Sequence, residues 1–429
     1  MKKGKCPSLR LPTPPPAETL LDVAQGLRTD AASAVDSTLL GEAVSRAERI
    51  MDARPTSEVT VVSWNVWFAE TAFDDRLVGL VDELLSIAPD VIGLQEVTQR
   101  FATAIRGSAV LAALYDISTN DVGAYGCLML AAADLSPSFR EVALPSNMGR
   151  SLLLCECPAS WSASAASDTA HNTQRPPFTI GTVHLESLNH EVLRRQQLEL
   201  CAAELRACRG GACLCGDFNF DATRTWGEWR RPAANLAGPA VALERLAATG
   251  DARAVRLENE NLQSVLPEFV DCWPAIHGTA TAAAASAAAS APPPGAAIAH
   301  VPSEDDVMGF TFDGMTNPGC CADPQERMRY DRIMCRVRAA GADAGAAGGM
   351  RRMLAIAKSV VPSWAGSKPS GSGDSVLDCA MKPVGITLLG RRCIPTPLAG
   401  AYYAGVLVKA SDHYGLCARL QFDAVSSLA

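Results

Sequence analysis

The sequence lacks the features that mark several large protein classes. No apolar stretch reaches membrane-spanning length without charges or helix breakers, so we expect no stable insertion into a membrane. No cysteine and histidine spacing typical of zinc sites is present, and no serine or cysteine lies in a nucleophile motif. A net charge of −8 disfavours a surface that grips nucleic acid through bulk positive charge. An anionic substrate would therefore be held locally, by a metal ion and a few arginines.

The 15 cysteines are explained more simply as buried thiols than as disulfides. Cys155 and Cys157 are separated by one residue inside an apolar run, as are Cys213 and Cys215, which places each pair on one face of a strand. No signal peptide opens the chain, and disulfides are rare in reducing compartments. We therefore predict a soluble intracellular protein, nuclear or cytoplasmic.

The sequence divides into a short N-terminal stretch, a helical segment and one large domain. Residues 1–16 carry four Lys/Arg, five prolines and no acid, which predicts a disordered start and is also compatible with an organellar targeting peptide. Residues 17–58 have helically spaced apolar side chains and predict an extension outside the core. The domain itself is expected over residues 59–422.

Three low-complexity stretches interrupt that domain. Residues 159–177 are rich in Ser and Ala, residues 280–299 are poly-alanine with Ser and a Pro triplet, and residues 339–349 are Ala and Gly. None has an apolar stripe, so we predict that they are loops inserted into the fold.

Between the insertions, short apolar strands alternate with helices. Strands are predicted at residues 59–68, 90–94, 125–131, 152–157, 178–184, 212–215, 332–335, 384–389 and 414–420, with helices at 74–88 and 191–208. This alternation, with mixed spacing between strands, predicts two packed sheets covered by helices.

Five polar clusters lie at the ends of such strands, where a layered α/β fold gathers distant residues into one site. Their carboxylates, carboxamides and histidines suit a hard divalent cation and a phosphate ester, with water as the attacking group. Taken singly, each has an ordinary explanation as a turn or a helix start. The clusters are Ser63-Trp64-Asn65, Leu94-Gln95-Glu96, His184-Leu185-Glu186-Ser187, Gly216-Asp217-Phe218-Asn219 and Ser411-Asp412-His413.

Individual residues in these clusters have distinct chemical uses. Glu96 ends an apolar strand and is a candidate ligand for Mg²⁺. Asp217 and Asn219 can face the same cavity, where an acid beside a carboxamide positions and deprotonates water. Asp331 opens another strand and could hold His413 by a hydrogen bond, which would fix its tautomer and raise its pKa.

The order and context of the clusters resemble the endonuclease/exonuclease/phosphatase superfamily, and within it the type 2 tyrosyl-DNA phosphodiesterases. The likeness covers roughly residues 59–422. Besides the five clusters, it is carried by Tyr125-Gly126, Leu144-Pro145-Ser146 with Arg150, Arg194 with Gln197-Leu198, Val270-Asp271-Cys272-Trp273, Phe310-Thr311-Phe312-Asp313 and Tyr330-Asp331-Arg332-Ile333.

The resemblance implies an α/β fold, a four-layer αββα sandwich of the deoxyribonuclease type, and phosphodiester hydrolysis with Mg²⁺ or Mn²⁺. It implies that Glu96 binds the metal and that Asp412 lies near it. It assigns catalysis to Asn65, Asp217, Asn219, His413 and the supporting Asp331. It assigns substrate binding to His184, Ser187, Arg150, Arg194 and Phe312.

Two departures leave the substrate open. Trp67 stands where the tyrosyl-DNA enzymes carry an acid, and Asp221 stands where they carry an arginine. We therefore keep two substrate hypotheses. One is a 5′-tyrosyl adduct on DNA ends, and the other is a different phosphate ester, such as RNA, a nucleotide, sphingomyelin or an inositol phosphate. An inactive binding module is the third hypothesis, and metal-dependent turnover of a generic phosphodiester separates it from the other two.

Overall fold

A computed structural model describes residues 37–162, 173–222, 258–278, 308–317, 321, 323, 325–337, 379–391 and 409–423. The predicted disordered start, residues 17–36, the middle of the first insertion and the whole of the other two insertions lie outside these residues. The proposed domain boundaries stay predictions.

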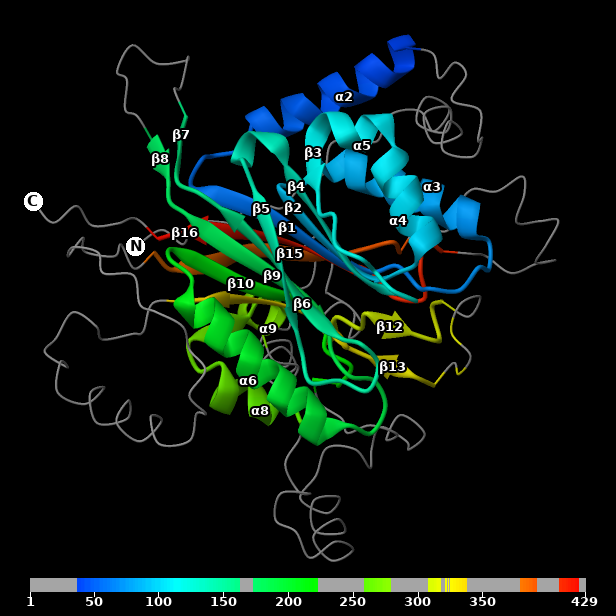
Figure 1. The fold of residues 1–429 in the computed structure, drawn as a ribbon, viewed down its shortest axis with the longest axis vertical. Coiled ribbons are helices and arrows are strands. Elements are labelled where there is room, and N and C mark those ends of the chain that lie inside the picture. The colour runs from blue at the N-terminus through cyan, green and yellow to red at the C-terminus, as the bar shows by residue number, and fades with distance from the viewer. Residues whose placement is uncertain are drawn as a thin grey trace, which may run out of the picture.

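Two six-stranded sheets dominate the structure (Figure 1). The strands of the first sheet are, in spatial order, β15 (Met381–Leu389), β16 (Gly415–Phe422), β1 (Glu58–Asn65), β2 (Val91–Val97), β4 (Gly126–Ala132) and β3 (Tyr115–Ile117). Those of the second are β11 (Phe269–Asp271), β14 (Asp331–Arg336), β10 (Gly211–Asp217), β9 (Phe178–His184), β6 (Ser151–Cys157) and β5 (Ser138–Ala143). In each sheet one pair is parallel, β1 with β2 and β9 with β10, and the other pairs are antiparallel.

Helices cover the outer faces of both sheets, as Figure 1 shows. On the first sheet lie α2 (Ser37–Asp52), α3 (Phe73–Ile87), α4 (Gln99–Gly107) and α5 (Ala109–Leu114), and a short η1 (Ala133–Leu135) follows β4. On the second sheet lie α6 (Glu191–Ala207) and α8 (Glu260–Val265), while α9 (Cys272–His277) contacts β14 and β15. Two hairpins, β7 (Ser160–Ser162) with β8 (Thr173–Arg175) and β12 (Phe312–Asp313) with β13 (Arg327–Met328), complete the described elements. The predicted four-layer αββα sandwich is confirmed.

The helices of the described ranges include none with the length and apolarity that a membrane crossing requires. The apolar residues form three main clusters, one between the sheets and one under each helical layer. Cys155, Cys157, Cys213 and Cys215 belong to the cluster between the sheets and are free thiols, as the sequence predicted.

The alternation of side chains along the strands explains where the polar residues go. In β1, Val59 and Val61 face the other sheet, so Asn65 at the strand's end lies on that same face. In β10, Cys213 and Cys215 face the first sheet and Asp217 continues their row. The polar strand ends therefore extend the inter-sheet layer beyond its apolar part.

Two glycines allow the close approach of backbone and side chains near these strand ends. Gly216 has φ 139°, and a Cβ there would lie 1.9 Å from the carbonyl oxygen of Val183. A Cβ at Gly93 would lie 2.7 Å from Oγ1 of Thr182 in the opposite sheet. The backbone conformation at Gly216 and the close packing at Gly93 therefore require glycine.

Candidate active site

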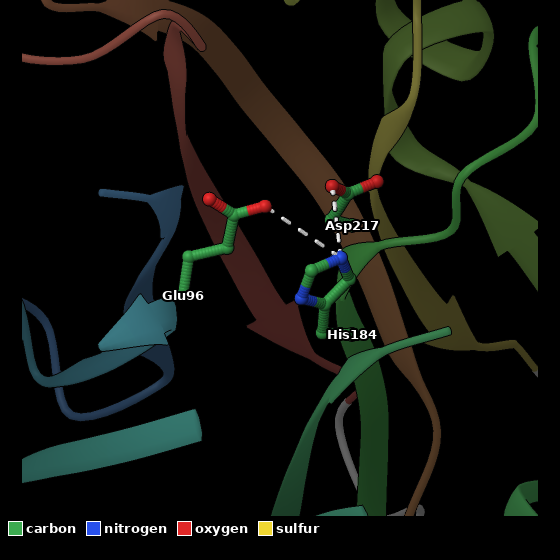
Figure 2. A group of neighbouring side chains, drawn as sticks. All are labelled: Glu96, His184 and Asp217. Atoms are coloured by element: carbon green, nitrogen blue, oxygen red, sulfur yellow. Dashed lines mark ion pairs between the residues drawn. The ribbon is translucent and has the colours of Figure 1, made fainter. Parts of the chain in front are cut away.

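Asp217 is the centre of a polar cluster at the ends of the central strands. Its Oδ2 lies 3.6 Å from Nε2 of His184 and 3.9 Å from Nε2 of His413. Glu96 approaches from the first sheet, with Oε1 at 3.9 Å from the same His184 nitrogen, and Figure 2 shows Glu96, His184 and Asp217 pointing toward one another. Residues far apart in the sequence are therefore brought within reach of one small ligand.

Two asparagines fix the carboxylate of Asp217. Nδ2 of Asn65 donates to Oδ2 at 3.0 Å, and the backbone N–H of Asn219 donates to Oδ1 at 2.9 Å. Burial alone would raise the pKa of Asp217, but the charge of His413 and these hydrogen bonds hold it below the ordinary value. Asp217 is therefore an ionised, oriented carboxylate at neutral pH.

His184 is a neutral imidazole with a defined tautomer. Nη1 of Arg150 lies 3.0 Å from Nδ1 of His184, and because a guanidinium only donates, Nδ1 must accept. The proton is then on Nε2, which faces Asp217 and Glu96. Burial, together with the charges of Arg150 and His413, lowers the pKa of His184 to about 3 despite the opposing effect of Asp217. His184 can donate to a phosphoryl oxygen, a role that suits it better than metal ligation.

His413, in contrast to His184, is cationic. Its Nδ1 lies 2.8 Å from Oδ2 of Asp331, which opens β14 and is fully buried. Burial opposes ionisation, but Asp331, Asp217 and Asp412 together raise the pKa of His413 well above its usual value. The pairing of His413 with Asp331 that the sequence suggested is present, and the imidazolium Nε2–H faces the site.

Glu96 and Asp412 are the two acidic residues that the sequence predicts to lie at a metal ion. Burial raises the pKa of Glu96, although His413 and the Phe68 N–H oppose this, and burial together with Glu96 raises that of Asp412 to about 7. Both pKa values are raised mainly because burial disfavours the charged carboxylate, and a cation bound there would favour the ionised form. Among the described residues, Glu96, His184 and Asp217 offer ligand atoms within 4.8 Å of one another, as do Asp217, Asp331 and His413. Carboxylate oxygens are the ligands that Mg²⁺ prefers.

Backbone strain coincides with these residues. Glu96 has φ 59° at the irregular end of the β2–β4 pairing, and Asn219 has φ 57° after β10. Left-handed conformations cost free energy for residues other than glycine and cluster at functional sites. The strain turns Glu96 out of the strand alternation, so that its carboxylate accepts from the N–H of Phe68 at 3.1 Å.

The substrate-binding residues predicted from the sequence fall into two groups. Arg150 donates to Oγ of Ser187 at 2.9 Å, so both lie beside His184, and the ring of Phe312 contacts the edge of His413 with centroids 5.1 Å apart. Arg194, by contrast, is buried and pairs with Glu258, with Nε–Oε1 at 2.5 Å. Its Nη1 donates to the carbonyl oxygens of Glu186 and Leu188. Arg194 is therefore placed to support the loop after β9, not to reach a substrate.

Asp221, which stands where the tyrosyl-DNA enzymes carry an arginine, lies inside the fold. It is buried, and its Oδ1 accepts from the backbone N–H of Arg329 at 2.7 Å. Its negative charge therefore does not project into an open cleft, because it anchors the approach to β14.

Several residues with a part in the site were not among those predicted. Glu186 is fully buried and accepts from Ser146 and from the N–H of Asn147, which holds the loop that carries Arg150. Its place in the His-Leu-Glu-Ser element was the available signal. Arg76 donates to several backbone carbonyl oxygens of the loop after β1, and its position among the buried apolar residues of α3 was the corresponding signal.

The chain is similar to one known protein family and to several solved structures. The sequence profile of the Endonuclease/Exonuclease/phosphatase family matches residues 62–413. No curated protein sequence matches the chain. Similar solved structures include TDP2 from Caenorhabditis elegans (18% identity, TM-score 0.49, covering 98% of this chain and 99% of that one). Others are D. rerio TDP2 complexed with single-strand DNA product (17%, 0.47, 85% and 99%) and the human Nocturnin catalytic domain with bound sulfate (13%, 0.42, 85% and 94%).

Proposed function

The chain belongs to the Endonuclease/Exonuclease/phosphatase family, and from this premise we propose that it hydrolyses phosphodiesters with water and Mg²⁺ or Mn²⁺. The observation that carries the proposal is the carboxylate of Asp217 between a neutral and a cationic imidazole, with Glu96 opposite. A base, two N–H hydrogen-bond donors and a cation site are parts that suit in-line attack on a phosphate.

The nucleophilic water belongs next to Asp217. Asp217 is ionised, and its two oxygens keep lone pairs beyond those used by Asn65 and Asn219, so it can accept a proton from water as the oxygen attacks phosphorus. As the new bond forms, the bond from phosphorus to the ester oxygen on the far side breaks, and that oxygen leaves as an alkoxide or phenoxide. The amide of Asn65 orients that carboxylate without adding charge. Asn219 also donates from Nδ2 to the carbonyl oxygen of Leu185 at 2.9 Å, which ties the loop after β10 to the end of β9.

The two imidazoles serve the phosphoryl oxygens. His413, held cationic by Asp331, places a positive charge and an N–H where negative charge develops. His184 donates a second N–H from its neutral ring, with Arg150 behind it. A divalent ion held by Glu96 and Asp412 would supply charge neutralisation for the phosphate.

For the substrate we propose a 5′-linked tyrosyl adduct on DNA ends. The support is the resemblance in the His184–Ser187 and Phe310–Asp313 elements, which is more restricted than the superfamily-wide clusters. Phe312 is partly exposed beside His413 and offers a face for a terminal base. Arg150 contacts both Nδ1 of His184 and Oγ of Ser187, so these residues lie beside the second imidazole near Asp217.

The catalytic proposal is tested by metal removal and by one substitution. Full-length protein should hydrolyse bis(p-nitrophenyl) phosphate with Mg²⁺ or Mn²⁺, lose that activity in excess chelator and recover it when the metal is returned. Glu96→Gln should raise the metal concentration needed for half-activity and lower turnover about 10²-fold or more. The matched control is Glu199→Gln on the exposed face of α6, which should behave as wild type. Undiminished activity in chelator would refute the metal-dependent mechanism.

The substrate is tested separately. Release of tyrosine from a 5′-phosphotyrosyl oligonucleotide is compared with hydrolysis of unmodified DNA, RNA and sphingomyelin at equal enzyme and metal. The tyrosyl oligonucleotide should have the highest kcat/KM, and its KM should rise steeply with salt. Preference for any of the others would overturn the substrate assignment and leave the hydrolytic proposal in place.

A further inference from the structure

Phe68 is an exposed aromatic residue at the edge of the candidate active site. Its side chain is 49% exposed, although most large apolar residues of the described ranges are buried. Its ring stacks on Tyr125 with centroids 5.1 Å apart and an interplanar angle of 15°. Tyr125 in turn lies 6.1 Å from the ring of His184 and beneath the guanidinium of Arg150. Phe68 and Tyr125 thus form an aromatic wall that adjoins the residues around Asp217.

The backbone of Phe68 is tied to the candidate metal ligand. Its N–H donates to Oε2 of Glu96 at 3.1 Å, so a hydrogen bond links the wall directly to that carboxylate. Trp67, at φ 60°, donates its own N–H to Oδ1 of Asn65 at 3.0 Å. The segment that carries Phe68 is therefore hydrogen-bonded to two residues of the site, Asn65 and Glu96.

Arg76 holds this segment in place from the side of α3. It is 2% exposed and donates to the carbonyl oxygens of Val66, Trp67, Ala69 and Thr71. Its guanidinium also lies over the ring of Trp67 at 4.7 Å. A segment fixed by so many donors presents its aromatic ring in one orientation, so a ligand that stacks on it meets a pre-ordered surface.

We propose that the Phe68–Tyr125 wall is a specificity site that binds a planar ring carried by one of the two groups esterified to the scissile phosphate. The inference rests on the proposed phosphodiesterase function and concerns which substrates that site prefers. The exposed edge of the wall adjoins the phosphate position defined by His184 and Arg150, and aromatic faces bind planar rings by stacking. The ring can be a nucleobase on one side of the phosphate or an aryl alcohol on the other, and the experiment distinguishes these sources.

The test uses four oligonucleotides that differ at the 5′ end. The first nucleoside carries a base or is an abasic tetrahydrofuran, and its 5′-phosphate is esterified to tyrosine or to hexanol. Phe68→Ala should lower kcat/KM about tenfold for substrates with the recognised ring, the effect of one lost stacking contact, and less than about twofold for the substrate without either ring. If Phe68→Ala lowers kcat/KM for the hexyl ester that carries a base, the recognised ring is the nucleobase. If it lowers kcat/KM for the tyrosyl ester at an abasic end, the recognised ring is the aryl group.

Two further variants and a control separate stacking from folding. Phe68→Leu keeps an apolar contact with Tyr125 and should lose the ring preference, whereas Phe68→Trp should retain it. Leu200→Ala, on the exposed face of α6, should change nothing. An equal loss on all four substrates would overturn the wall's role, because it would show a structural effect on Glu96.

A binding measurement keeps this inference separate from the proposed function. Affinity of the four oligonucleotides is measured by fluorescence anisotropy with Ca²⁺ in place of the active metal. If wild type hydrolyses none of them but binds the ringed ones more tightly in a Phe68-dependent way, the wall stands and the hydrolytic proposal fails. If neither turnover nor binding depends on the ring at Phe68, the wall is refuted.

Discussion

His184 and His413 point the same nitrogen at the same carboxylate, yet they differ in charge. Arg150 lies behind Nδ1 of His184, and Asp331 lies behind Nδ1 of His413. The first arrangement leaves the pKa of a buried imidazole low, at about 3, and the second raises it well above the usual value. The residue behind each ring therefore decides whether that ring is a neutral donor or a cation.

The comparison extends to the two halves of the fold. His184 ends β9 of the second sheet, and His413 lies two residues before the start of β16 in the first. Oδ2 of Asp217 lies 3.6 Å from Nε2 of His184 and 3.9 Å from Nε2 of His413. Two histidines placed by two different sheets thus give one site a neutral N–H donor and a cationic N–H donor. A single histidine could not provide both.

Removing the shared carboxylate should have the largest effect. Asp217→Asn should lower kcat about 10³-fold on a phosphodiester, because a base is lost, and His413→Ala should fall by a similar amount. If the two act as one unit, the double variant should be no worse than either single variant in single-turnover assays. Losses that multiply would show independent roles. Asp116→Asn, on the exposed side of β3, is the control.

Removing the carboxylate that keeps His413 cationic should shift the pH dependence of kcat/KM. Asp331 raises the pKa of His413, so Asp331→Asn should lower it. Activity that needs the imidazolium is present below this pKa and is lost as pH rises through it, so the alkaline limb of kcat/KM should shift to lower pH. We expect about a 10- to 100-fold loss at neutral pH that partly recovers on acidification. An unshifted alkaline limb would exclude His413 as the titrating group.

Substituting the residues behind the neutral His184 should have the smallest effect on activity. Arg150→Gln removes a charge that lowers the pKa of His184 but keeps a hydrogen-bond donor, while burial, the larger cause, stays. The His184 pKa should therefore rise from about 3, measurable by NMR titration of the ring. We expect kcat/KM to fall about tenfold. Ser187→Ala, which removes one partner of Arg150, should stay within a few-fold, and a larger loss there would assign Ser187 a direct substrate contact.

The strand alternation made the centre of the site predictable. Because successive residues of a buried strand face opposite sides, a polar residue at its end inherits the face of the apolar residues before it, as at Asn65 and Asp217. The pairing of His413 with Asp331 was also accessible, since both stand at strand starts. What each residue does in catalysis remains a prediction.

Helix and loop residues were less predictable, because their partners lie elsewhere in the sequence. Arg194 follows the His-Leu-Glu-Ser element as a binding residue would, but its orientation is decided by Glu258, 64 residues away. Arg76 and Phe68 gave still weaker signals. Their partners are backbone atoms and a stacked ring, which no pattern of side-chain types reports.

The pairing of β1 with β16 joins two segments of the first sheet that are synthesised far apart in time. Oγ of Ser411 donates to the carbonyl oxygen of Asn65, a residue made 346 positions earlier. At ribosomal speeds of roughly 5–20 residues per second, on the order of 20 to 70 s separate the two. During that interval the β16-facing edge of β1 has no partner strand from this sheet, and an open strand edge is a template for pairing with other chains. Until residue 413 is made, the growing chain carries Asn65, Glu96 and Asp217 without His413.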